Sequence, residues 1–154
     1  MPAGFNDVCL AFFRKYFDAF DRDKIGRVRN DDFATLIRAC GAAPLETSIE
    51  DLRAIADPSR RGSFSFDDFC VALKKAFAES ISLQEVRDAF HSFDPDKRGF
   101  ISPHELRYFL TTMGDVLSAE EMNEFAEEMR TEMDIEGNLV MADCIDKMTP
   151  EMFR

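Results

Sequence analysis

The chain repeats one spacing of residues four times, and this repeat restricts the fold more than any other feature. Each copy has an acidic residue at its first position, a glycine at the sixth, a hydrophobic residue at the eighth and an acidic residue at the twelfth. The glycines lie 36, 37 and 38 residues apart, which indicates one supersecondary unit copied four times. The glycines are Gly26, Gly62, Gly99 and Gly137, the hydrophobic residues are Val28, Phe64, Ile101 and Leu139, and the closing acids are Asp32, Asp68, Glu105 and Asp143.

The residues on either side of each loop predict helices. Before the first loop, Phe13, Phe17 and Phe20 recur at helical spacing. Thr47 and Glu50 have the spacing of a capping box, which predicts that the third helix begins there. Each repeat is therefore predicted to be a helix, a twelve-residue loop and a second helix.

The four units are predicted to pair. We expect an all-α fold in which the hydrophobic eighth residue of each loop lies in a short strand that pairs with the strand of its neighbour. Two such pairs give two lobes, 1–78 and 79–154, joined by a linker. Ser82 and Glu85 form a second capping box, so a new helix is predicted to begin just after the linker.

The two halves of the chain differ in charge and composition. Residues 1–78 contain twelve basic and twelve acidic residues, whereas residues 79–154 contain seven basic and eighteen acidic residues. The second half therefore carries the whole net charge of −11. All methionines after Met1 lie in the second half, and ten of the sixteen phenylalanines lie in the first. This difference predicts that the two lobes bind different surfaces.

Several functional classes find no support in the sequence. The chain has no nucleophile-base spacing, phosphate-binding glycine loop or zinc pattern, so we predict no enzyme and no small-molecule substrate. It has no basic face for nucleic acid, and no apolar run long enough for a membrane span. The start of the chain lacks the core of a signal peptide. We therefore expect a cytoplasmic protein with reduced cysteines.

The first two loops depart from the ligand pattern of calcium. Calcium requires six to eight oxygen atoms, which such a loop supplies from positions 1, 3, 5, 7, 9 and 12. In the first loop, Ile25 stands at position 5 and Arg29 at position 9. In the second, Arg61 stands at position 5, and the closing Asp68 is a short side chain. We predict that neither loop binds calcium well.

The third loop is the best preserved, and the fourth is ambiguous in register. The third loop predicts one weak Ca²⁺ or Mg²⁺ site at most, because Arg98 replaces the oxygen ligand at position 5. In the fourth loop, spacing from Gly137 makes Glu132 the first position, whereas the helical positions of Met129 and Met133 make Asp134 the first. No metal is predicted to be required. The predicted metal ligands in the third loop are Asp94, Asp96, Ser102 and Glu105.

The chain resembles the calmodulin superfamily, which includes calmodulin, troponin C, centrins and myosin light chains. The resemblance covers nearly the whole chain, with all four units in order. It is carried by the segments 17–23, 86–96 and 132–137. Because the loops are degenerate while the scaffold is intact, the chain is more similar to myosin light chains, and to light chains of other motors, than to calmodulin.

The resemblance implies a partner helix. Light chains of this type hold a basic, amphipathic IQ-type helix of a heavy chain in hydrophobic grooves, often without calcium. It also implies association with the cytoskeleton, in a motor or an axonemal assembly. The matching groove positions are Phe93, Leu106, Leu110, Met113, Leu117, Met122, Phe125, Leu139 and Met148 in the second half, and Phe13, Phe17, Phe20, Phe33, Ile37 and Phe69 in the first.

Two other functions remain open at this point. The chain is a calcium sensor if its third loop binds calcium and thereby exposes the hydrophobic surface of the acidic lobe. A calcium buffer requires several competent loops and fits the sequence least well. In the fourth unit, Cys144 replaces an aromatic residue and Lys147 replaces a groove methionine of the family, so this unit is expected to be unusual.

Overall fold

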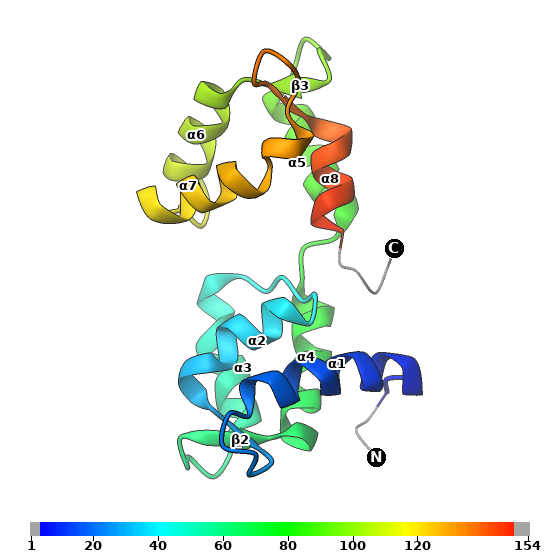
Figure 1. The fold of residues 1–154 in the computed structure, drawn as a ribbon, viewed down its shortest axis with the longest axis vertical. Coiled ribbons are helices and arrows are strands. Elements are labelled where there is room, and N and C mark those ends of the chain that lie inside the picture. Colours follow the sequence, from blue (N-terminus) through cyan, green and yellow to red (C-terminus); the bar gives the residue numbers. More distant parts are fainter. Residues whose placement is uncertain (1–3, 150–154) are drawn as a thin grey trace. The chain divides into compact units, whose positions relative to one another are not determined.

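The computed structural model describes residues 4–149 of the chain. These residues form two compact units (Figure 1). The first lobe, as we call it, extends to Ile81, and the second lobe comprises Ser82–Thr149. Within the described residues, each lobe contains four α-helices and one two-stranded antiparallel sheet. The predicted all-α fold with paired loop strands is confirmed.

In the first lobe, the two loops are joined by their strands. Val28 at the centre of one strand lies opposite Phe64 at the centre of the other. Both side chains are buried, because the hydrophobic eighth residue of each loop points away from solvent and into the helices. The elements are α1 (Asp7–Phe20), β1 (Arg27–Arg29), η1 (Asn30–Asp32), α2 (Phe33–Ala39), η2 (Glu46–Ser48), α3 (Ile49–Ala56), β2 (Ser63–Ser65) and α4 (Phe66–Glu79).

Phenylalanine rings fill the core of the first lobe. Phe64 stacks on Phe69 with ring centroids 5.7 Å apart, and its edge meets the ring of Phe33 at 5.5 Å. Phe17 completes this group, with its centroid 6.1 Å from that of Phe64. All four rings are fully buried. Aromatic rings at these distances attract one another in addition to being buried, so this group of rings stabilises the core of the lobe.

The second lobe has the same order of elements but a smaller buried core. Helix α5 packs against α8, and α6 packs against α7. Ile101 and Leu139, which are paired across the strands, are fully buried. The elements are α5 (Leu83–Phe93), β3 (Phe100–Ile101), α6 (Pro103–Thr112), α7 (Ala119–Glu128), η3 (Arg130–Glu132), β4 (Leu139–Val140) and α8 (Met141–Met148).

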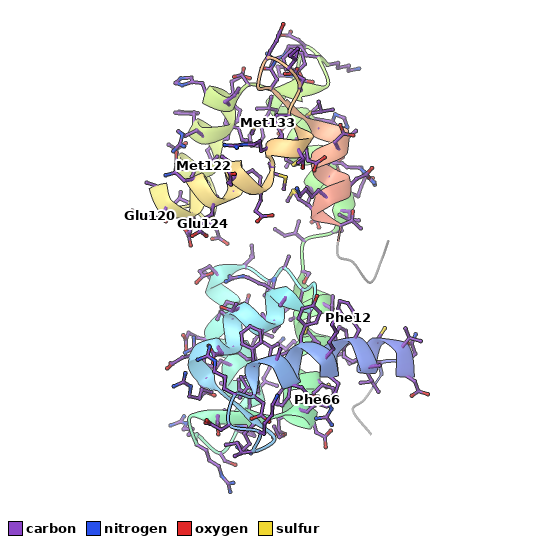
Figure 2. The ribbon with its side chains drawn as sticks, in the orientation of Figure 1. Phe12, Phe66, Glu120, Met122, Glu124 and Met133 are labelled. Carbon is purple, nitrogen blue, oxygen red and sulfur yellow. The ribbon has the colours of Figure 1, made fainter. Side chains whose placement is uncertain are left out.

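Different side chains fill the two lobes. Met122 and Met133 lie among the helices of the second lobe, whereas Phe12 and Phe66 belong to the first (Figure 2). Met122 is 2% exposed and belongs to the core of the second lobe. Methionine is flexible and polarizable, so a core built partly from it adapts more readily than one built from phenylalanine rings.

Serine residues begin three of the helices in the second lobe. Ser82, Ser102 and Ser118 each accept a hydrogen bond from the backbone amide three residues later, and the carboxylate of the glutamate there accepts one from the backbone amide of the serine. The capping box predicted at Ser82 is thus confirmed. No helix within residues 4–149 is long and apolar enough to cross a membrane.

The capping box predicted at Thr47 is wrong. Thr47 lies within the 3-10 turn Glu46–Ser48, which continues directly into α3. Ser48, the residue before α3, has helical backbone angles and makes no side-chain capping bond. A capping box requires an extended backbone at the N-cap, so the continuous turn leaves no place for one.

Candidate functional site

The first three loops share one closed conformation around a buried aspartate. The carboxylate of each aspartate accepts a hydrogen bond from the amide of the fifth loop residue and another from the amide of the sixth. The fourth loop residue has a positive φ of 51–54° in all three loops. The backbone therefore forms the same turn in each loop. The aspartates are Asp21, Asp57 and Asp94, which are 5%, 5% and 1% exposed.

In the first loop, some of the ligand positions lack oxygen donors. The side chain of Ile25, at position 5, points into solvent and is 67% exposed. The closing Asp32 instead lies 3.6 Å from the guanidinium of Arg22. This loop therefore lacks an oxygen at position 5 and has a cation beside position 12.

In the second loop, both acids have other partners. Asp57 accepts a hydrogen bond of 2.9 Å from the side-chain amide of Asn30, which comes from the first loop. The closing Asp68 accepts a hydrogen bond of 2.8 Å from the hydroxyl of Ser65. The pKa of Asp57 is lowered, chiefly because the backbone amide of Arg61 stabilises the charged carboxylate. The loop is held by internal hydrogen bonds.

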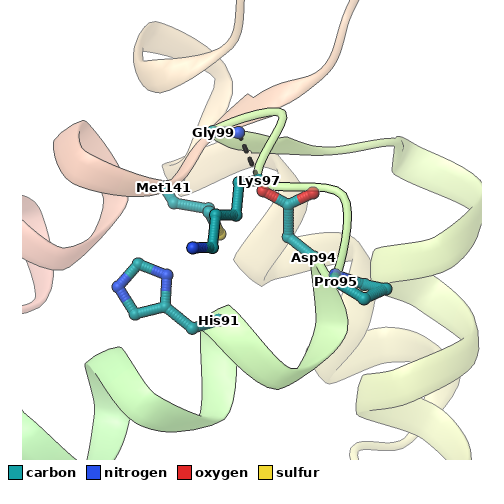
Figure 3. Close-up of a pocket in the computed structure, with 6 residues that line it drawn as sticks. All are labelled: His91, Asp94, Pro95, Lys97, Gly99 and Met141. Carbon is teal, nitrogen blue, oxygen red and sulfur yellow. Dashed lines mark hydrogen bonds between the residues drawn. The ribbon is translucent and has the colours of Figure 1, made fainter.

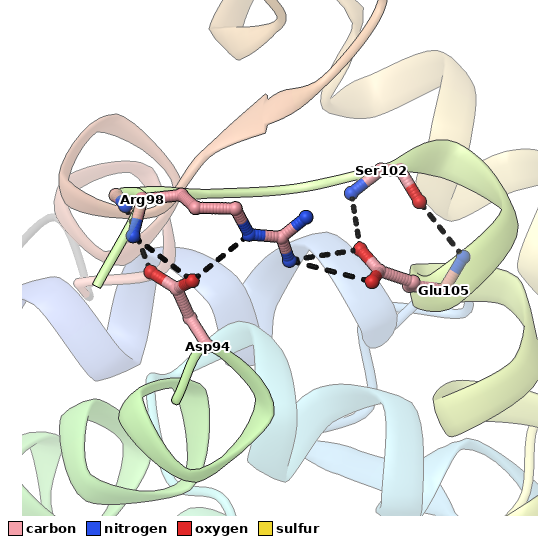
Figure 4. A network of polar contacts seen from close by, with 5 residues as sticks. Asp94, Arg98, Ser102 and Glu105 are labelled. Carbon is pink, nitrogen blue, oxygen red and sulfur yellow. Dashed lines mark hydrogen bonds and ion pairs between the residues drawn. The ribbon is translucent and has the colours of Figure 1, made fainter. Parts of the chain in front are cut away.

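In the third loop, one arginine joins the first and last ligand positions. The Arg98 Nε lies 3.1 Å from Oδ1 of Asp94, and its Nη2 lies 3.3 Å and 3.2 Å from the two carboxylate oxygens of Glu105 (Figure 4). The guanidinium also packs over the ring of Phe100, 5.1 Å from its centroid. Arg98 thus lies between the two carboxylates that a calcium ion would join in such a loop.

The ionisation of these groups agrees with the geometry. Burial raises the pKa of Asp94, but hydrogen bonds from Gly99 and Arg98 outweigh it, so the net pKa lies below its usual value. The pKa of Glu105 is lowered, first by the amide of its capping residue Ser102 and then by Arg98. The pKa of Arg98 is raised by its bonds to both carboxylates. All three groups are therefore charged at neutral pH.

Most of the predicted metal ligands in the third loop have partners within the protein. The carboxylates of Asp94 and Glu105 are paired with Arg98, and the hydroxyl of Ser102 accepts the amide hydrogen of Glu105 at 3.2 Å. Asp96 is exposed. Among residues 4–149, no group of three or more histidine, cysteine, aspartate or glutamate side chains is placed to hold a metal ion. The assignment of Asp94, Asp96, Ser102 and Glu105 as weak metal ligands stays a prediction.

A cavity beside the third loop offers no alternative ligand set. It has a volume of about 500 Å³ and is open to solvent (Figure 3). Its one carboxylate is that of Asp94, which accepts the Gly99 amide at 2.8 Å. The other groups around it are a histidine, a lysine and apolar side chains. The lining residues are His91, Asp94, Pro95, Lys97, Gly99 and Met141.

The fourth loop adopts a shorter turn that begins at Asp134. Its carboxylate accepts the amides of Glu136 and Asn138, both at 2.9 Å. Met133 forms a bridge with Leu139, which closes the loop two residues earlier than in the others. Of the two registers that the sequence left open, the structure therefore adopts the one that starts at Asp134.

Lys147 contacts the residues that would begin the fourth loop in its other register. The Lys147 ammonium lies 3.2 Å from a carboxylate oxygen of Glu132 and 3.1 Å from the hydroxyl of Thr131, and it also donates to the backbone oxygen of Glu128. These contacts join α8 to the 3-10 turn Arg130–Glu132. Glu132 is thereby directed toward a lysine from α8.

The groove positions predicted in the first lobe are mostly closed. Phe20 is half-buried and packs on the edge of the core. The others are fully buried, so their rings contact one another. A partner helix would have to displace this packing, which is costly in a close-packed core. The fully buried positions are Phe13, Phe17, Phe33, Ile37 and Phe69.

The groove positions predicted in the second lobe are more available. Leu106, Met122 and Leu139 are buried in the core. Met113 is 52% exposed and Met148 is 41% exposed, although both are apolar. The remaining positions lie at the border of the core and are half-buried: Phe93, Leu110, Leu117 and Phe125.

Comparison with known proteins identifies the family. A model of the EF-hand domain matches residues 14–77, and a model of an EF-hand domain pair matches residues 83–140. Together these matches span most of each lobe and all of the first three loops. The chain is an EF-hand protein. The membership predicted from the four repeated loops is confirmed.

This EF-hand protein is similar to a calmodulin-like protein in sequence and to two solved myosin-associated structures in fold. A protein of Oryza sativa subsp. japonica described as calmodulin-like protein 6 is 29% identical over 127 residues, which cover 80% of this chain and 75% of that protein. The regulatory domain of Physarum polycephalum myosin II has a TM-score of 0.68 at 21% identity, covering 92% of this chain and 95% of the other. Mlc1p bound to IQ2 of Myo2p, a class V myosin, has a TM-score of 0.66 at 24% identity, covering 88% and 93%. At these identities, the solved structures establish the fold alone.

Two features of the EF-hand site were missed by sequence reasoning. Phe109 stacks on Phe93 with ring centroids 4.1 Å apart, and the two line a cavity of about 560 Å³ together with Met113. Phe109 follows the closing Glu105 by one helical turn, so helical spacing could have revealed it. The second feature is the capping box of Ser102 and Glu105, which has the same spacing as the box recognised at Ser82.

Proposed function

We propose that the chain is a non-catalytic light chain that holds a basic, amphipathic IQ-type helix of a larger protein. The acidic second lobe is its principal binding surface, and binding does not require calcium. The larger protein belongs to a cytoskeletal motor or a ciliary complex. The first lobe makes a separate and less basic contact.

The difference in burial between the lobes is the observation that carries this proposal. Equivalent groove positions are closed over by phenylalanine packing in the first lobe and partly exposed in the second. Met113 and Met148 each leave more than 40% of their surface in solvent. Exposed apolar side chains beside a half-buried apolar border are typical of a surface that a partner covers. The apolar face of a helix is a suitable partner for such a surface.

Charge supports a basic partner. The second half of the chain carries the entire net charge of −11. Helix α7 contributes Glu120 and Glu124, which project from it into solvent (Figure 2). An acidic surface around an apolar strip attracts a helix with basic residues beside its apolar face and accelerates its capture.

Two further observations support binding without calcium. The third loop already holds its first and last carboxylates together through Arg98. A similar structure, Mlc1p, is described as bound to IQ2 of a class V myosin. This likeness in fold makes an IQ-type helix the first partner to test.

The test is calorimetric titration of the full chain with a basic IQ-type peptide in the presence of a calcium chelator. Met113→Asp and Phe125→Asp should each weaken binding at least tenfold, because a buried Met or Phe side chain contributes about 1.5–3 kcal/mol and an aspartate adds an unpaired charge. Far-UV circular dichroism should be unchanged.

Ile135→Asp is the matched control. Ile135 is fully exposed in the turn of the fourth loop, and its substitution makes the same charge change within the same lobe. Its affinity should remain within twofold of the parent chain. Unchanged affinity in both groove variants would contradict the assignment of the surface. Binding that appears only when calcium is added would favour the calcium-sensor alternative.

A further inference from the structure

The contacts of Arg98 differ from those of arginine in the other loops. Arg61 occupies the same fifth position of the second loop, yet it bridges no carboxylates within residues 4–149. The reason lies in the closing acid. Asp68 is one methylene shorter than Glu105 and accepts a hydrogen bond from Ser65. Only the third loop combines an arginine at position 5 with a glutamate at position 12.

Arg98 satisfies the groups that a bound cation would satisfy. Asp94 is 1% exposed and would leave a charged carboxylate buried without a counter-ion if the loop were empty. The guanidinium supplies that counter-ion at 3.1 Å and reaches Glu105 with its other end at 3.2 Å. A guanidinium presents several donors in a fixed plane, so it can contact two carboxylates at once. It therefore connects the end of α5 to the start of α6.

The same contacts exclude a divalent ion. A calcium ion must be coordinated by both carboxylates at 2.3–2.6 Å, and the guanidinium lies between them. Position 5 would also have to contribute an oxygen, which arginine lacks. A metal ion can enter only if the Arg98 side chain moves away. That movement would break the contacts of Arg98 with both carboxylates and with the ring of Phe100.

We infer that Arg98 is a built-in cation that holds the third loop in its closed form, and that it masks a latent divalent-cation site formed by Asp94, Asp96 and Glu105. The loop is then fixed in one state at any calcium concentration. This inference goes beyond the proposed partner binding, since it concerns the loop alone and holds whatever the partner is.

The experiment is calorimetric titration of the full chain with CaCl₂ in metal-free buffer. The parent chain should bind too weakly to give a fitted site below millimolar calcium. Arg98→Asn supplies an oxygen at position 5, and it should bind one calcium ion at least tenfold more tightly than the parent chain. The amide resonance of Gly99 should shift on calcium addition, which assigns the ion to the third loop.

Two variants make the test specific. Arg98→Lys keeps the positive charge but loses the planar guanidinium group, and this variant should remain without a calcium site. Arg61→Asn removes the same charge from the same position of the second loop, and it should gain no site because Asp68 is short. Without calcium, Arg98→Asn should lower the melting temperature of the second lobe, and calcium should restore it.

The outcomes separate clearly. A micromolar calcium site in the parent chain would overturn the inference, as would an Arg98→Asn variant that is folded but gains no site. Equal gains in Arg98→Asn and Arg61→Asn would also overturn it, because the bridge to Glu105 would then be irrelevant. None of these outcomes depends on whether an IQ-type peptide binds.

Discussion

Truncation of Phe64 should unfold the first lobe under mild conditions. The ring is fully buried at the centre of β2 and contacts the rings of Phe17, Phe33 and Phe69 at centroid distances of 5.5–6.1 Å. Phe64→Ala removes this ring and leaves a cavity, which costs about 3–5 kcal/mol. A lobe of this size has a total stability of about 4–12 kcal/mol. The variant should therefore lose between a quarter and all of its stability.

The chain offers a simple spectroscopic assay for this loss. It contains no tryptophan and two tyrosines, Tyr16 in α1 of the first lobe and Tyr108 in α6 of the second. In a Tyr108→Phe background, tyrosine fluorescence reports on the first lobe alone. Urea titration of this background, with and without Phe64→Ala, gives the difference in the free energy of unfolding.

Val8→Ala is the control for the loss of an apolar group. Val8 lies in α1 of the same lobe and is 79% exposed, so its truncation should change stability by less than about 0.5 kcal/mol. Phe64→Leu should give an intermediate loss. A loss below about 2 kcal/mol for Phe64→Ala would refute the view that this ring group holds the lobe together.

Further predictions concern ionisable groups and helix caps. Burial raises the pKa of Cys40 to about 12 and that of Cys70 to about 11, from an ordinary value of 9.0. Above pH 9.0, the folded state therefore keeps thiol protons that the unfolded state loses, so the stability of the first lobe should fall as the pH rises. Equal stability in urea titrations at pH 8 and pH 10.5 would contradict this prediction. Ser118→Ala removes the cap of α7 and should cost about 1 kcal/mol in urea unfolding of the second lobe. Lys147→Met and Glu132→Gln should each destabilise the fourth unit, and their double-mutant cycle should give a coupling of about 0.5–1 kcal/mol, whereas zero coupling would show that the ion pair contributes nothing.

The repeated architecture was predictable because it depends on local chemistry. A glycine at position 6 permits the positive φ that the turn requires, as at Gly26 and Gly99, where φ is 76° and 82°. An aspartate at position 1 accepts the amides that this turn exposes. The apolar residue at position 8 then places Val28 and Ile101 in strands. Each of these residues acts within a few positions of itself, so the sequence pattern contains the necessary information.

The burial of the predicted groove was not predictable in the same way. Ile37 and Leu110 each lie five residues after the closing acid of their loop, yet the first is fully buried and the second is half-buried. The difference depends on how completely the other side chains of each lobe fill the space, which is a tertiary property. Composition gave a partial signal, because phenylalanine is concentrated in the first half and methionine in the second.

In the fourth loop, a side chain distant in the sequence contacts one of two competing local patterns. The sequence contains a complete acidic loop starting at Glu132 and an apolar helix face that includes Met133. Only one of these two patterns can form in the folded chain. Lys147 lies fifteen residues beyond Glu132 but comes within 3.2 Å of it in the folded lobe. This ion pair holds Glu132 near α8, while the turn begins at Asp134 and Met133 pairs with Leu139. The lysine that departs from the family pattern therefore contacts the glutamate that would begin the other register, and it favours the one observed.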